Sequence, residues 1–192
     1  MPAETTSFVG RRYELAEARR KLTTARLVSL TGPGGVGKTR LAVRIAAALS
    51  RGFAAGAWLA ELAELRDPGL VANVVLAALD LRDQTAAEPL ARLRAYLRDK
   101  ELLLVVDNCE HLLDAAAQVI SEIITAAPGV RVIATSREPL SVAGEHVLPV
   151  PPLELPGPDP AEPLARLRQN EAVMLFTERA AAASGRQRPV RR

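Results

Sequence analysis

The chain has 192 residues, of which 48% are hydrophobic and 24% are charged. This length and balance are typical of one main globular domain with room for a small appendage, and they exclude a disordered or fibrous protein. The net charge is only +3 and the basic residues are mostly scattered arginines, so we expect this segment not to bind nucleic acid directly.

The amino-terminal residues lack the basic start and apolar stretch of a secretory signal, and charges interrupt every apolar stretch before it reaches membrane-spanning length. Cys109 is the single cysteine, so no intrachain disulfide can form. We therefore expect a cytoplasmic protein without a membrane partner, in which Cys109 is a buried structural thiol.

Short β-branched runs alternate with longer helical patterns along the chain, which is typical of strands joined by helical crossovers in a parallel sheet. The expected strands cover residues 26–31, 56–61, 102–106, 130–135 and 145–150. The expected helices cover residues 38–50, 68–79, 89–99, 112–127 and 170–183. The predicted fold class is α/β, a three-layer sandwich with a mostly parallel central sheet of about five strands.

Prolines divide the chain into parts. Seven of them fall between residues 149 and 163, a density that forbids regular secondary structure. We therefore expect a main domain over residues 1–150 and a proline-rich linker over 151–165. Residues 166–192 are expected to begin a helical subdomain and to end in a disordered basic tail.

The segment Gly32–Thr39 has the sequence Gly-Pro-Gly-Gly-Val-Gly-Lys-Thr, which matches G-x-x-x-x-G-K-[ST] between an expected strand and an expected helix. Its glycines let backbone amides surround an anion, and the positive end of the following helix adds to that field. We expect Lys38 to reach the β- and γ-phosphates of a nucleoside triphosphate and Thr39 to bind Mg²⁺. The expected nucleotide contacts are Gly32, Pro33, Gly34, Gly35, Val36, Gly37, Lys38, Thr39 and Arg40.

Asp107 follows the longest uninterrupted aliphatic run of the chain, which places it at the sheet edge where phosphate-binding loops gather. Beside this P-loop we expect it to hold Mg²⁺ rather than to cap a helix. Many P-loop ATPases have an acidic base at the next position, but here that residue is Asn108, which cannot act as a base. Glu110 is the candidate substitute, with a solvated glutamate as the alternative. We therefore expect slow turnover, or a site that mainly holds nucleotide.

Arg137 follows the expected strand 130–135, where its side chain is placed to reach a γ-phosphate and report its presence. The same position also suits a surface ion pair with Glu138 or another acid. His111 and His146 complete no metal-binding or triad pattern with their neighbours.

Four segments in order carry a resemblance to a known family. They are Phe8–Arg11 (FVGR), Leu30–Leu41 (LTGPGGVGKTRL), Leu103–Leu112 (LLVVDNCEHL) and Ala134–Leu140 (ATSREPL). Together they resemble the NB-ARC-like ATPase domain of bacterial STAND regulators. The combination of Asn108 with Glu110 is similar to the subgroup attached to LuxR-type and SARP-type transcriptional regulators, and residues 172–180 resemble the start of the family's small helical domain.

This resemblance implies a molecular switch in which ADP holds a closed form and ATP permits opening and assembly, usually with sensor and effector domains on the same polypeptide. It implies that Val9, Gly10 and Arg11 contact the adenine and that Arg137 senses the γ-phosphate. Family members continue through further domains, so the chain is expected to be a fragment of a larger regulator. Its expected partners are the nucleotide, other domains of that regulator, or further copies formed on ATP binding.

Two other function classes remain as alternatives. One is a stand-alone small P-loop ATPase or phosphotransferase, although a GTPase is disfavoured because no N-K-x-D segment is present to select guanine. The other is a degenerate interaction module, against which the intact Lys38, Thr39 and Asp107 argue.

Overall fold

The computed structural model describes residues 7–81, 87–157 and 163–184, and the chain divides into two compact units. The first unit contains Arg12–Pro151, and the second combines Pro152–Arg192 with the segment Ala3–Arg11, each within the described ranges. The predicted basic tail over residues 185–192 lies outside the described residues. The second unit is therefore built from both ends of the chain.

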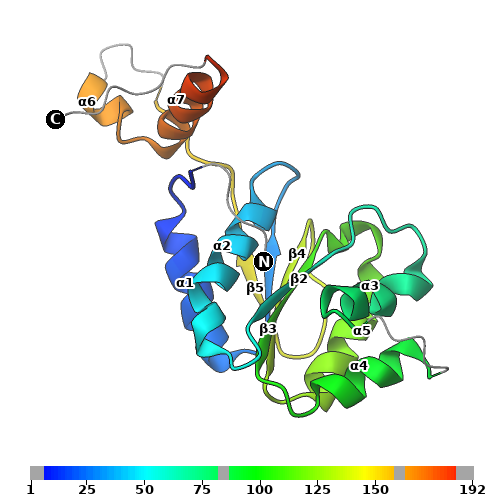
Figure 1. Ribbon diagram of the computed structural model, residues 1–192. Coiled ribbons are helices and arrows are strands. Elements are labelled where there is room, and N and C mark those ends of the chain that lie inside the picture. Colours follow the sequence, from blue (N-terminus) through cyan, green and yellow to red (C-terminus); the bar gives the residue numbers. More distant parts are fainter. Residues whose placement is uncertain (1–6, 82–86, 158–162, 185–192) are drawn as a thin grey trace. The chain divides into compact units, whose positions relative to one another are not determined.

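The first unit contains one sheet of five parallel strands in the order β2-β3-β4-β1-β5 (Figure 1). The strands are β1 (Leu27–Thr31), β2 (Ala57–Glu61), β3 (Leu102–Asp107), β4 (Val130–Ser136) and β5 (Glu145–Pro149). Every residue of β1 and β3 is buried, as expected for strands covered by helices on both faces. This arrangement confirms the predicted α/β three-layer fold.

Helices cover both faces of the sheet (Figure 1). The helices on one face are α1 (Arg12–Thr24) and α2 (Lys38–Leu49), and those on the other are α3 (Val71–Ala78), α4 (Pro89–Leu97) and α5 (Leu113–Ala126). Short 3₁₀ turns add η1 (Ser50–Gly52), η2 (Pro68–Leu70) and η3 (Cys109–His111). Only α1 had no counterpart among the expected helices of this unit, because its buried apolar stripe is narrow, with Ala18 and Leu22 one turn apart.

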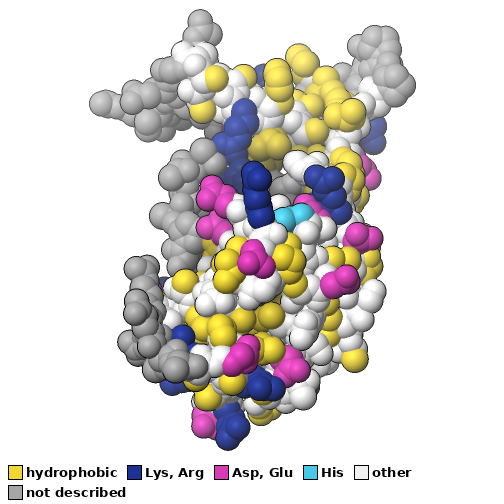
Figure 2. Space-filling model, turned by 90° about the vertical axis from the view of Figure 1, so that its right-hand side faces the viewer, with side chains coloured by type: hydrophobic (Ala, Val, Ile, Leu, Met, Phe, Trp, Pro, Cys, Tyr) yellow, Lys and Arg dark blue, Asp and Glu magenta, His cyan; other side chains and the backbone are white. Residues whose placement is uncertain are grey.

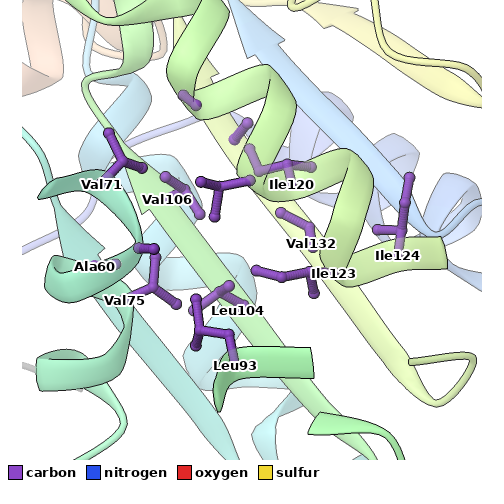
Figure 3. Close-up of a cluster of buried hydrophobic side chains, with 14 of the residues drawn as sticks. Ala60, Val71, Val75, Leu93, Leu104, Val106, Ile120, Ile123, Ile124 and Val132 are labelled. Carbon is purple, nitrogen blue, oxygen red and sulfur yellow. The ribbon is translucent and has the colours of Figure 1, made fainter. Parts of the chain in front are cut away.

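A cluster of buried hydrophobic side chains lies between the sheet and helices α3–α5 (Figure 3). Leu104 on β3, Ile120 and Ile123 on α5, and Leu93 on α4 have at most 1% of their surface exposed. Burying such a side chain stabilises the folded state by about 1.5–3 kcal/mol each. This packing fixes β3 and β4, whose carboxyl ends carry the candidate site.

The strand register brings polar residues together at the carboxyl edge of the sheet. Val106 of β3 pairs with Ala134 of β4, so the next residues, Asp107 and Thr135, lie side by side. On the other side of β4, Ser136 pairs with Thr31, the last residue of β1 before the P-loop. Three strand ends therefore meet where the P-loop begins.

The second unit contains α6 (Leu164–Leu167) and α7 (Glu171–Ala183). Asn170 caps α7 by accepting hydrogen bonds from the N–H groups of Ala172 and Val173, at 3.0 and 3.2 Å. The Arg11 N–H donates to Glu171 Oε2 at 3.2 Å, which joins the amino-terminal segment to this helix. The proline-rich stretch between the units has no regular secondary structure over residues 150–157.

Among the described residues, no helix is both long and apolar enough to span a membrane. On the face in Figure 2, acidic and basic side chains are interspersed among apolar ones.

Candidate nucleotide-binding site

The P-loop connects β1 to α2, as the motif predicts. Gly32 has φ +153°, and a Cβ atom there would collide with the carbonyl oxygen of Val150, which follows the neighbouring strand β5. Gly37, just before α2, has φ +91° in the left-handed region. Both positions therefore require glycine, one for space and one for backbone conformation. In loops of this kind, the backbone amides and the amino end of the following helix face the bound phosphate.

Lys38 is the first residue of α2, and only 8% of its surface is exposed. Its Nζ atom donates to the carbonyl oxygens of Gly32 and Pro33, at 2.9 and 3.0 Å. These bonds use two of the three donors of the ammonium group. The positive charge is therefore held inside the loop, at the place where an anion is expected.

Asp107 ends β3 with 4% of its surface exposed, and both of its carboxylate oxygens accept hydrogen bonds. The Thr39 hydroxyl donates to Oδ2 at 3.1 Å, and the Thr135 hydroxyl donates to Oδ1 at 2.6 Å. A buried carboxylate needs such donors, because removing it from water without partners is costly. The two expected metal ligands, Thr39 and Asp107, are thus in direct contact although 68 residues separate them.

The donor set fits magnesium. A hydroxyl and a carboxylate are the hard oxygen ligands that this ion prefers, and it takes one or two carboxylates together with phosphates and water in nucleotide sites. No cluster of three or more His, Cys, Asp or Glu side chains that could hold a metal ion exists within the described residues. Thr39 and Asp107 therefore suit an ion whose remaining ligands come from a nucleotide, rather than a site built from protein alone.

After Asp107 the chain turns sharply into η3. Asn108 has φ 66° and ψ 48°, and its N–H donates to the Thr135 hydroxyl at 2.9 Å. Cys109 is fully buried, as predicted, and this burial, with the negative charges of Asp107 and Glu110, raises the pKa of its thiol to about 12. The thiol is thus a packing group that stays protonated at neutral pH.

Glu110 and Arg137 form an ion pair, with 3.4 Å between Glu110 Oε1 and Arg137 Nε. The Glu110 side chain is 16% exposed, and its Oε2 atom is buried without a hydrogen-bond partner in the described part of the chain. Arg137 also lies beside the P-loop, since a Cβ atom added to Gly34 would be 3.6 Å from Arg137 Nη2. The surface ion pair expected as one alternative therefore exists, with Glu110 rather than Glu138 as the acid.

The other predicted site residues are placed as follows. Arg40 lies in the first turn of α2, directly after Thr39. Val9, Gly10 and Arg11 belong to the second unit, so their contact with adenine stays a prediction. His146 is exposed on β5, and the exposed His111 ring lies 2.9 Å from the carbonyl oxygen of Leu65.

Thr135 is the site residue that the sequence interpretation missed. It was assigned only to a strand, because the motif drew attention to the residues that follow it. A polar residue at the carboxyl end of a buried strand was the available signal, but the strand order was needed to place it next to Asp107.

A family model described as an AAA domain matches residues 19–136, which include the P-loop, Asp107 and Thr135. The chain belongs to this AAA domain family. The match covers the sheet from β1 to β4 and ends at Ser136, the last residue of β4. The chain therefore contains a P-loop domain of the AAA type.

Curated relatives were found in Mycobacterium and Streptomyces species. An uncharacterized protein of Mycobacterium tuberculosis is 41% identical over 175 residues, or 91% of this chain and 41% of the relative. A second protein of that organism, with the provisional name HTH-type transcriptional regulator, is 40% identical over 84% of this chain and 17% of the relative. The regulatory protein AfsR of Streptomyces griseus is 32% identical over 77% of this chain and 16% of its own length. The chain thus spans less than half the length of each.

Solved structures show the same fold. A signal transduction ATPase with numerous domains (STAND) from Pyrococcus horikoshii, which has a tetratricopeptide repeat sensor, aligns with a TM-score of 0.55 at 18% identity. The alignment covers 96% of this chain and 29% of that protein. A Walker-type ATPase of Pyrococcus abyssi aligns with a TM-score of 0.55 at 14% identity, over 98% of this chain and 63% of its own.

Proposed function

We propose that the chain is the ATP- and ADP-binding switch module of a cytoplasmic STAND-type transcriptional regulator, of the NB-ARC-like kind, with slow or no ATP hydrolysis in isolation. The observation that carries this proposal is the convergence of Lys38, Thr39 and Asp107 at one edge of the sheet. Lys38 would bind the β- and γ-phosphates, and Thr39 and Asp107 would hold Mg²⁺. The bound ion would neutralise phosphate charge.

The pairing of Glu110 with Arg137 supports holding over hydrolysis. A general base must be free to accept a proton from water, whereas the Glu110 carboxylate is 3.4 Å from the guanidinium of Arg137. A γ-phosphate would offer Arg137 a second anionic partner, so the guanidinium would distinguish ATP from ADP. Both residues would then respond to the phosphate that defines the two states of the switch.

The second unit supports a role inside a larger protein. It contains several large apolar side chains that are well exposed: Leu155 (80%), Leu164 (72%), Met174 (41%) and Phe176 (74%). Exposed apolar side chains in one region are typical of interaction surfaces. Relatives named as regulators are several times longer than this chain, so further domains of such a regulator, or further copies, are the partners that we propose.

The proposal is tested by purifying the full chain without added nucleotide, releasing what is bound, and measuring ATP turnover. Lys38→Ala and Glu110→Ala are compared with the wild type. Lys21→Ala is the matched control, because that lysine pairs with Glu17 on α1.

We expect the wild type to retain ADP and to hydrolyse ATP at a rate near background. Only Lys38→Ala should lose the bound ADP. Rapid hydrolysis that both Lys38→Ala and Glu110→Ala abolish would replace the switch by a stand-alone ATPase. Absence of nucleotide affinity in the wild type would overturn the site assignment as a whole.

A further inference from the structure

We propose that Thr135 is a positioning residue that fixes the carboxylate of Asp107 for Mg²⁺, an inference that rests on the proposed nucleotide-binding function. Thr135 is 1% exposed and lies on β4, a different strand from Asp107. Its hydroxyl donates to Asp107 Oδ1 at 2.6 Å, within the short range of hydrogen bonds to a charged oxygen.

The direction of these hydrogen bonds is determined by chemistry alone. An ionised carboxylate only accepts, so the single hydroxyl hydrogen of Thr135 points to Asp107. A backbone N–H only donates, so the bond of 2.9 Å from Asn108 uses a lone pair of the same hydroxyl oxygen. The hydroxyl therefore has both its hydrogen and a lone pair engaged, and its orientation is fixed.

Thr135 differs from the other partner of the carboxylate. Thr39 also donates to Asp107, at 3.1 Å, but it is itself an expected metal ligand. Once its oxygen binds the ion, Thr39 is itself one of the metal ligands, so it is not an independent support for the Asp107 carboxylate. Thr135 is a donor to Asp107 that does not itself bind the ion, which is the usual arrangement of a group that orients a metal ligand.

The same hydroxyl also joins two parts of the site. Asp107 ends β3, and Asn108 begins the turn that leads to Glu110. Because Thr135 bonds to both residues, a change at this hydroxyl disturbs the metal ligand and the start of that turn together. Loss of the hydroxyl should therefore weaken the contribution of Mg²⁺ to nucleotide binding more than it weakens the nucleotide's own contacts with the P-loop.

The experiment measures the dissociation constant of ADP for the full chain, once with Mg²⁺ and once with EDTA, and takes the ratio. Thr135→Val replaces the hydroxyl by a methyl group of similar size, and Thr135→Ser keeps the hydroxyl. Ser29→Ala is the matched control, since Ser29 Oγ is a buried hydroxyl on the neighbouring strand β1 without a hydrogen-bond partner among the described residues. Because each ratio is taken within one variant, a general loss of stability does not change it.

We expect Thr135→Val to reduce the Mg²⁺-dependent gain in ADP affinity about tenfold, a typical effect for groups that orient metal ligands. The ADP affinity of Thr135→Val in EDTA should stay within about twofold of the wild type. The Mg²⁺-dependent gain in ADP affinity should also stay within about twofold of the wild type in Thr135→Ser and in Ser29→Ala. If Thr135→Val does not fold, Thr135→Ala is measured against Thr135→Ser in the same way.

An unchanged gain in Thr135→Val, with Mg²⁺-dependent binding intact in the wild type, would overturn this inference and leave the proposed function standing. The inference would also be overturned if Thr135→Ser reduced the Mg²⁺-dependent gain as much as Thr135→Val does, because loss of the hydroxyl would then not explain the reduction. A wild type that binds no nucleotide would instead refute the proposed function, and the inference with it.

Discussion

Replacing Arg137 by glutamine removes the guanidinium beside the P-loop and leaves a shorter, uncharged polar side chain. If Arg137 senses the γ-phosphate, the variant should bind ATP more weakly and ADP unchanged. A hydrogen bond to a charged group contributes about 1.5–3 kcal/mol. To bind the γ-phosphate, Arg137 must give up its ion pair with Glu110, and the energy of that pair is subtracted. The pair contributes about 0–1 kcal/mol, because the arginine side chain is 68% exposed. The net preference is about 0.5–3 kcal/mol, or roughly 2- to 150-fold in ATP affinity.

Glu110→Gln should act with the opposite sign. Removing the carboxylate frees Arg137 from its competitor, so ATP affinity should rise by up to about fivefold, the equivalent of about 1 kcal/mol. In the Arg137→Gln background the same substitution should have no effect on ATP affinity, because the interaction that it removes is already gone. This double-mutant cycle separates the ion pair from any independent effect of either residue.

The assay is calorimetric titration of ADP and of a non-hydrolysable ATP analogue into the full chain at low and high salt. Arg94→Gln is the control, since Arg94 pairs with Glu122 at 3.1 Å on α4 and α5, away from the P-loop. Equal weakening of ADP and ATP binding by Arg137→Gln would refute sensing and leave Arg137 as a general phosphate contact. No change in either affinity would leave only the surface ion pair.

Three further outcomes are expected. Lys38→Ala should weaken binding of ATP at least about tenfold by titration, because a charged donor to phosphate is lost, and unchanged affinity would contradict the assigned role. Burial raises the pKa of Cys109 to about 12, so in the folded chain the thiol should resist alkylation at pH 8 and react only after unfolding in urea; rapid labelling of the native protein would contradict this. Leu104→Ala should lower the free energy of unfolding by about 2–5 kcal/mol in urea titrations, since Leu104 is fully buried, and a loss below about 1 kcal/mol would show that the core relaxes around it.

Local signals made much of the fold predictable. The expected strands and most helices of the first unit correspond to observed elements within a few residues, because buried strands are continuous apolar runs and prolines mark helix starts. The P-loop was predictable because its residues are contiguous and its chemistry is carried by the backbone. Helix α1 was not, since six of its thirteen residues are charged and its buried stripe is only one residue wide per turn.

Contacts between distant segments could not be predicted in the same way. The Thr135–Asp107 bond depends on β4 lying next to β3, and the insertion of β1 between β4 and β5 is a property of topology rather than of pattern. The union of the amino-terminal segment with the carboxyl-terminal helices is a similar case, since the Arg11–Glu171 hydrogen bond joins residues 160 positions apart. No periodic pattern in the sequence of the two chain ends predicts that they contact each other.

The backbone conformation of Asn108 determines how the chain continues to Glu110, the acidic residue of this site two positions later. Its φ of 66° and ψ of 48° are left-handed, a region that asparagine tolerates better than most residues with a long side chain. In that conformation its N–H meets the Thr135 hydroxyl, and the chain turns at once into η3. Glu110 then lies on the turn, where its carboxylate pairs with Arg137. The turn thus links the lack of an acid next to Asp107 to the ion pair of Glu110 with Arg137. Under the proposed function, both features would favour holding the nucleotide over hydrolysing it.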